Sequence, residues 1–168
     1  MLGFLSKLFG GSKSEKDVKK LEPIIAKVNT HFNALQSLNN DQLRNKTQEF
    51  RQRIKEHLVD IDAEIAERTK AADSLPFNDL LGKDAIYQEV DKLKKDKDKK
   101  IEEALNDIMA EAFAVVKETA RRFKENTEVV ATATQLDKDL SVKKNYVTIE
   151  GDKSIFKNTW TAGGGQVT

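Results

Sequence analysis

Apolar residues recur at helical spacing along three long segments, and this pattern constrains the fold more than any other feature of the sequence. The first segment, residues 14–38, is predicted to be a helix. Steps of three and four residues separate the members of its apolar stripe, which are Val18, Leu21, Ile25, Val28, Phe32 and Leu35. Because such a stripe needs a partner helix, we expect a contact within the chain, with homodimerisation as the alternative. Pro23 lacks an N–H group and therefore marks either the first turn of this helix or a kink.

The next two segments are predicted to form a long helical hairpin. Asn39, with Gln42 three residues later, is typical of a capping box at the start of a helix that covers about residues 40–72. After a loop with turn-forming residues, Asp84 is the predicted N-cap of a third helix over residues 84–124. At 1.5 Å per residue, a helix of this length spans about 60 Å.

The C-terminal part of the sequence changes from helical periodicity to short runs of β-branched and aromatic residues. These runs fall at 129–134, 146–149 and 155–160, and Glu150-Gly151-Asp152 is a turn signal between the last two. The pattern predicts two or three short strands within residues 127–168.

The first twelve residues are predicted to form a short amphipathic helix. At about 100° per residue, five apolar side chains fall within an arc of roughly 160°. They are Leu2, Phe4, Leu5, Leu8 and Phe9. With Lys7, Lys13 and Lys16 beside them, we expect this segment to bind a membrane surface or a channel, since each lysine near anionic headgroups contributes on the order of 1 kcal/mol. Packing of this helix on the protein itself is the alternative, and neither a signal peptide nor a membrane-spanning segment is expected.

Composition and charge argue against several classes of function. The net charge is +1, and no aromatic side chains interleave the lysine-rich segment 94–100, so nucleic acid is not an expected partner. The sequence has no cysteine, which excludes disulfides, thiolate metal sites and a cysteine nucleophile. His31 and His57 have no second ligand at metal spacing, and Glu102-Glu103 is expected to form salt bridges with neighbouring lysines. We therefore predict no catalytic, cofactor-binding or metal-binding residue here.

Two segments carry a resemblance to a known family. NDQLRNKTQEF (residues 40–50) resembles the start of the long N-terminal helix of the SecA preprotein translocase ATPases. EAFAVVKETARR (residues 111–122) resembles the helix that leads into the first nucleotide-binding fold of that family, and the opening decapeptide is also similar. The family usually has Leu-Pro before Glu-Ala-Phe-Ala, where this sequence has Met109-Ala110. Extra length over residues 59–100 and 127–168 indicates a long-insert subtype.

The resemblance implies a function for a longer parent chain. That chain would use ATP and magnesium to push preproteins through the SecY channel, working in the cytoplasm and on the cytoplasmic face of the inner membrane. The implied partners are an anionic phospholipid surface, the SecY channel complex, preproteins and a second copy in a homodimer. A GxxxxGK[ST] loop would hold the phosphates, and Gly163-Gly164-Gly165 has no Lys-Ser/Thr after it. We expect that loop to lie beyond Thr168.

The expected fold is therefore mainly α, with an amphipathic N-terminal helix, a long helical hairpin and a small β appendage; in the parent chain it would begin an α/β P-loop motor domain. The expected divisions are 1–12 for membrane or channel binding, 13–126 for the helices leading into the first nucleotide-binding domain, and 127–168 for an insertion with short strands. Part of the helix over 111–122 should expose apolar side chains that the parent chain covers. The alternative interpretation is a self-contained helical membrane-surface or scaffolding protein without catalysis.

Overall fold

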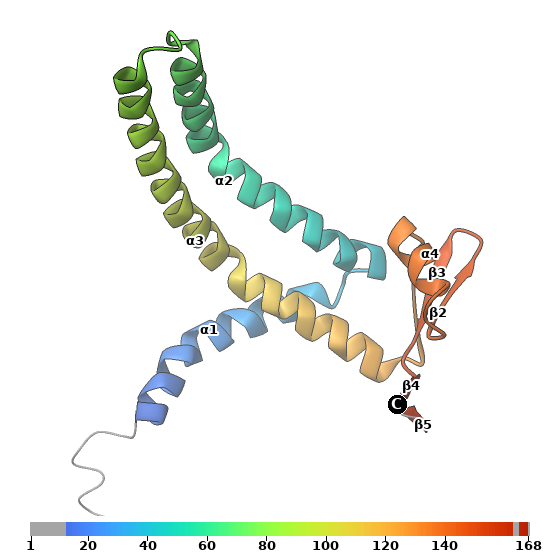
Figure 1. Ribbon diagram of the computed structural model, residues 1–168. Coiled ribbons are helices and arrows are strands. Elements are labelled where there is room, and N and C mark those ends of the chain that lie inside the picture. The colour runs from blue at the N-terminus through green and yellow to red at the C-terminus, as the bar shows by residue number, and fades with distance from the viewer. Residues whose placement is uncertain (1–12, 163–164, 168) are drawn as a thin grey trace, which may run out of the picture. The chain divides into compact units, whose positions relative to one another are not determined.

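The computed structural model describes residues 13–162 and 165–167, with side chains for residues 17–159 (Figure 1). The chain forms two compact units. Unit 1 contains the described residues up to Asn45 and those from Ala110 onward, and unit 2 contains Lys46–Met109. The predicted helix over residues 1–12 lies outside the described residues. Most of the described chain is helical and carries a small antiparallel sheet, which confirms the predicted mainly α class.

Helix α1, Lys13–Leu35, contains the first apolar stripe. Pro23 lies in its interior, so its alternative placement in the first turn is wrong. The helix ends at Leu35 and not near residue 38, because the chain turns there and the Leu38 N–H donates to the Leu35 carbonyl at 3.1 Å.

The core of unit 1 lies where α1 meets α2 (Asn40–Ser74) and α3 (Leu80–Glu125). Each of the three helices contributes one buried apolar residue: Leu35, Leu43 and Ala114. Partly buried apolar side chains pack around them, namely Val28, Phe32, Leu38 and Val115. One part of each of the three helices therefore contributes to this core, which removes the apolar surface of these side chains from water.

The predicted capping box at the start of α2 is present. The Asn39 N–H donates to Gln42 Oε1 at 2.9 Å, and the Gln42 N–H donates to Asn39 Oδ1 at 2.8 Å. This reciprocal pair satisfies two backbone donors that have no partner within the helix, and it fixes the residue at which α2 begins.

Unit 1 also contains a three-stranded antiparallel sheet with the order β1-β3-β2. Its strands are β1 (Glu128–Thr132), β2 (Val147–Glu150) and β3 (Lys153–Lys157). Strands β2 and β3 form a hairpin through Gly151, whose φ of 58° is a conformation that glycine adopts at little cost. The predicted run over 155–160 is divided, because β4 (Trp160–Ala162) pairs with β5 (Gly165–Val167) in a second sheet.

A short helix, α4 (Gln135–Ser141), connects β1 to β2 and was not predicted. Thr134, expected to lie in a strand, is instead its N-cap. The Thr134 hydroxyl accepts the Asp137 N–H at 3.3 Å, and Asp137 Oδ2 accepts the Thr134 N–H at 2.8 Å. The expectation of strands alone after residue 127 is wrong here, since this second capping box starts a helix.

Unit 2 is the antiparallel hairpin formed by α2 from Lys46 to its end and by α3 from its start to Met109. Apolar residues from both helices are buried along its length: Leu58, Ile61, Ala72, Val90, Ala104 and Ile108. Helix α3 begins at Leu80, so the prediction that Asp84 caps it is wrong. Asp79 Oδ1 accepts the Gly82 N–H at 2.9 Å and already provides the cap. Ion pairs join the two helices, including Lys97 with Asp62 at 2.6 Å.

Candidate functional site

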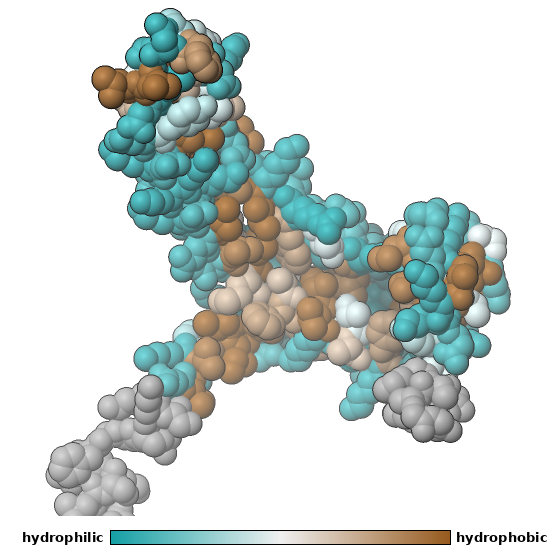
Figure 2. Space-filling model, in the orientation of Figure 1, coloured by the Kyte–Doolittle hydropathy of each residue, from teal (hydrophilic) through white to brown (hydrophobic). Residues whose placement is uncertain are grey.

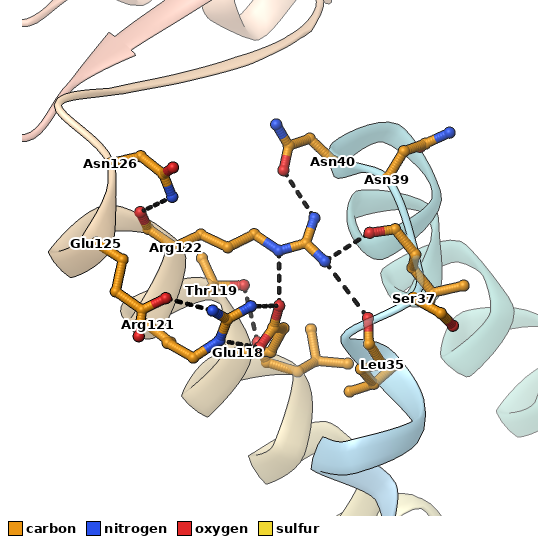
Figure 3. Close-up of polar contacts among 12 residues, drawn as sticks. Leu35, Ser37, Asn39, Asn40, Glu118, Thr119, Arg121, Arg122, Glu125 and Asn126 are labelled. Carbon is orange, nitrogen blue, oxygen red and sulfur yellow. Dashed lines mark hydrogen bonds and ion pairs between the residues drawn. The ribbon is translucent and has the colours of Figure 1, made fainter.

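The two segments that carry the family resemblance meet in unit 1. Residues of the first segment form the beginning of α2, and residues of the second lie in the last turns of α3. Side chains from both, together with the end of α1, form a network of hydrogen bonds and ion pairs that we call the helix junction (Figure 3). Its central members are Asn40, Arg44, Glu118, Arg121 and Arg122.

Glu118 is the buried anion at the centre of the helix junction. Its side chain has no exposed surface, yet both oxygens accept hydrogen bonds from arginines on the same helix (Figure 3). Arg121 donates to Glu118 Oε2 at 2.8 Å and to Oε1 at 2.7 Å, and Arg122 Nε donates to Oε1 at 2.8 Å. The hydrogen bonds from Arg121 are the main reason that the pKa of Glu118 is low, although burial raises it. The carboxylate therefore stays ionised inside the fold.

Arg122 extends from Glu118 to the other two helices. Its Nη1 donates to Asn40 Oδ1 at 2.7 Å, and its Nη2 donates to the Leu38 carbonyl at 2.6 Å and to the Leu35 carbonyl at 3.4 Å. The carbonyls at a helix C-terminus have no partner within the helix, and a cation there also interacts favourably with the helix dipole. One buried guanidinium thus fixes the end of α1 against the start of α2.

The beginning of α2 also covers the free edge of β1. Asn40 Nδ2 donates to the Val130 carbonyl at 2.7 Å, and Arg44 Nη1 donates to the Thr132 carbonyl at 3.0 Å. Asp41 accepts the Thr132 N–H at 2.7 Å and the Thr132 hydroxyl at 2.8 Å, and these bonds lower the pKa of Asp41. Strand β1 pairs with β3 on its other side, so side chains of α2 replace the missing neighbour strand.

Arg44 completes the connection between α2 and the β region. Its Nη2 forms an ion pair with Asp137, which is almost fully buried, and its guanidinium lies 5.7 Å from the centre of the Phe156 ring. Burial raises the pKa of Asp137, but hydrogen bonds from Arg44 and Thr134 together lower it below its usual value. Phe156 also meets Phe123 of α3 edge to face, with ring centres 6.4 Å apart. The sheet is therefore held by α2 and α3 together.

These carboxylates predict a loss of stability in acid. Glu118, Asp41 and Asp137 have lowered pKa values in the folded chain, so below about pH 4 the unfolded chain binds protons that the folded chain does not. Unfolding then becomes easier as the pH falls through this window and on toward the folded pKa values. We expect the midpoint of thermal unfolding, followed by circular dichroism from pH 7 to pH 3, to fall at the acid end. Glu118→Gln should flatten this dependence; an unchanged slope would contradict the assignment.

The helix junction holds structure and does not supply chemistry for catalysis. Its charges are paired with one another, and it contains no nucleophile beside a base. An open hollow of about 320 Å³ lies beside it, lined mainly by polar groups such as Asn40, Arg121, Arg122 and Asn126. Among the residues that the structure describes, no group of three His, Asp or Glu residues can hold a metal ion.

Most of the residues predicted to bind a membrane or channel are not described by the structure. The apolar residues 2–9 and Lys7 lie outside the described residues, and for Lys13 and Lys16 only the helical backbone is described. In the part of the chain that is described, no helix is long and apolar enough to cross a membrane. His57 lies on the surface of the hairpin, where its Nε2 is 3.5 Å from Glu103 Oε2; salt bridges of Glu102 and Glu103 with neighbouring lysines stay a prediction.

Among the described residues of unit 1, the helices α1 and α3 each expose apolar side chains. Val18, Leu21 and Ile25, the first half of the α1 stripe, are each about half exposed. Phe113 and Val116 of α3 are exposed as well, which confirms the apolar patch expected on the helix over 111–122. These surfaces are the places where further protein is expected to pack.

The sequence analysis missed the roles of Asn40, Arg44, Glu118, Arg122 and Asp137. Four of them lie within the two segments that carry the resemblance, but nothing local distinguishes them from neighbouring charged residues on the same helices. A sequence signal for Asp137 was present, because Thr134 with Asp137 three residues later has the spacing of a capping box.

Comparison with known proteins identifies the family to which this chain belongs. The family model described as the SecA DEAD-like domain matches residues 5–145. The chain belongs to the SecA family, as the resemblance predicted. No solved structure matches this chain.

The curated relatives extend this result over nearly the whole chain. The protein translocase subunit SecA of Parabacteroides distasonis is 42% identical over 165 residues, which are 98% of this chain and 14% of that protein. Its counterparts in Flavobacterium psychrophilum and Christiangramia forsetii are 41% and 43% identical, each over 96% of this chain and 14% of the relative. The chain thus spans about one seventh of the length of these relatives. Membership in this family does not favour a self-contained scaffolding protein.

Proposed function

We propose that this chain is the N-terminal region of an ATP-driven motor that pushes preproteins through the SecY channel. The observation that carries the proposal is the helix junction, in which both family segments meet around the buried Glu118 and Arg122. The junction joins α1, which follows the predicted membrane-binding residues, to the end of α3, which would lead toward the nucleotide-binding fold. In this proposal, ATP and magnesium act elsewhere in the longer chain.

A rigid junction suits this role for a physical reason. A motor transmits force only through connections that do not open under load, and buried charge-assisted hydrogen bonds are both directional and costly to break. Residues 1–12 would attach the motor to anionic lipid and to the channel, and the junction would carry that attachment to the motor domain. The protein would then work in the cytoplasm and as a peripheral protein on the cytoplasmic face of the inner membrane.

Sedimentation with lipid vesicles tests the attachment. We expect the full-length protein that carries this sequence to sediment with anionic vesicles and much less with neutral ones, because the five lysines among residues 7–20 each contribute on the order of 1 kcal/mol. Deletion of residues 2–12 should lower the bound fraction by about tenfold or more, since the apolar face and Lys7 are lost together.

A matched variant separates charge from apolar contact. Replacement of Lys7, Lys13 and Lys16 by glutamine keeps every apolar residue, and we expect it to weaken the preference for anionic lipid strongly, with Lys19 and Lys20 left in place. Equal sedimentation of the intact and shortened proteins would show that residues 1–12 pack on protein. The attachment would then have to come from another part of the chain.

A further inference from the structure

The closed end of the hairpin in unit 2 exposes an apolar surface that the proposed function does not use. Phe77, Leu80 and Leu81 are 92%, 71% and 86% exposed, and we call these three residues the tip patch. Brown side chains gather at this end of the hairpin in Figure 2, next to the loop between α2 and α3 in Figure 1. Fully burying one such side chain contributes about 1.5–3 kcal/mol, so leaving three in water is unfavourable unless a partner covers them.

Hydrogen bonds close the loop that carries the tip patch. The Leu75 N–H donates to the Ala72 carbonyl at 3.2 Å, and the Asp79 N–H donates to the Pro76 carbonyl at 3.1 Å. Asp79 then caps α3 through the Gly82 N–H, and a Cβ at Gly82 would lie 2.4 Å from Asp79 Oδ2, so a larger residue there would displace the capping carboxylate. The three apolar side chains are therefore presented by an ordered turn, which lowers the entropy lost when they bind.

The charges around the tip patch limit its partner. Between residues 73 and 84 there are three acidic residues, Asp73, Asp79 and Asp84, and one basic residue, Lys83. Lys83 Nζ lies 6.0 Å from the centre of the Phe77 ring, and Tyr87 donates to Asp73 at 3.2 Å. The surface is thus apolar at its centre and acidic at its rim. Anionic lipid would be repelled, and two tips facing each other would bring like charges together.

We propose that the tip patch docks into an apolar pocket with a lysine- and arginine-rich rim on the cytoplasmic surface of the membrane channel. This inference rests on the proposed function, which makes that channel the partner. Cytoplasmic loops of membrane proteins carry an excess of lysine and arginine, which complements the acidic rim of the tip. A few projecting aromatic and aliphatic side chains that fill a pocket are also the usual energetic centre of a protein interface.

Binding of the full-length protein to its channel complex in neutral-lipid nanodiscs tests this docking. Phe77→Ser together with Leu81→Ser should raise the Kd by about tenfold or more, because both anchors are lost. The matched control is Val59→Ser, which changes an apolar residue of α2 that is 52% exposed but lies outside the tip, and its Kd should stay within about twofold of the wild type. Both variants should keep the wild-type circular dichroism spectrum, since the replaced side chains are exposed.

Reversing one charge on the rim of the tip patch tests the docking independently. Asp84→Lys should also raise the Kd and reduce the dependence of binding on salt, because it replaces an acidic residue of the rim with a basic one.

An unchanged Kd for the Phe77/Leu81 variant, with strong binding by the wild type, would overturn the docking and leave the proposed function intact. No binding of the wild type to the channel would overturn both. A loss that occurs equally with channel-free nanodiscs would assign the tip to lipid, and a changed oligomeric state would assign it to a second copy.

Discussion

Replacement of Glu118 by alanine is expected to lower the local free energy of unfolding in unit 1 by about 3–5 kcal/mol. The substitution leaves the buried guanidinium of Arg122 without its carboxylate and removes both hydrogen bonds that Arg121 donates to Glu118. An unpaired buried charge is costly because water cannot reach it. The contacts of Arg122 with the end of α1 should loosen as a consequence.

Native-state hydrogen exchange in the full-length protein measures this effect residue by residue. We expect protection of the amides in the last turns of α1 and α3 to fall by more than about 100-fold, which corresponds to the predicted change in free energy. Glu125→Ala is the matched control on the same helix, since Glu125 is half exposed and also pairs with Arg121. That change should cost about 1 kcal/mol or less. Equal effects of the two substitutions would show that burial of Glu118 does not determine its contribution.

Replacement of Asp137 by alanine is expected to cost about 2–4 kcal/mol and to loosen the attachment of the β region to α2. Asp137 accepts a hydrogen bond from Arg44 and caps α4 through the Thr134 N–H, and its side chain is almost fully buried. The substitution therefore breaks the ion pair and the capping box at once. Arg44 retains its bond to the Thr132 carbonyl, which limits the loss.

Exchange of the amides in β1 and α4 is the appropriate measurement for this variant. Protection there should fall strongly, whereas the amides of unit 2 should keep wild-type protection because their helices pack on each other. Asp139→Ala provides the control, since Asp139 is exposed and accepts only an exposed hydrogen bond from Gln135 at 2.9 Å. A uniform fall in protection over both units would contradict a local role for Asp137.

Much of the helical fold is predictable from the sequence because the signals are local. Helix α1 shows the stripe with steps of three and four, and Asn39 with Gln42 correctly marks the start of α2. These signals depend on residues a few positions apart, within one or two turns of helix. The strands β1, β2 and β3 were found for the same reason, since runs of β-branched residues mark them.

The errors have equally physical causes. Helix α4 has only seven residues, too few for an apolar period, so its capping box at Thr134 was the only clear sign of it. Asp84 and Asp79 are both capable N-caps, and the choice between them depends on how the turn after Pro76 closes. The approach of Gly82 to Asp79 decides this, and it appears only in three dimensions.

The sequence by itself therefore determined the three long helices and the family, because each depends on the order of nearby residues. Only the tertiary structure decided which charges are buried. Arg122 bonds to Asn40 across 82 positions and Arg44 bonds to Asp137 across 93. In a chain with 34% charged residues, no local pattern shows which few lose contact with water. Burial makes those few pairs strong, and burial is a property of the packed helices as a whole.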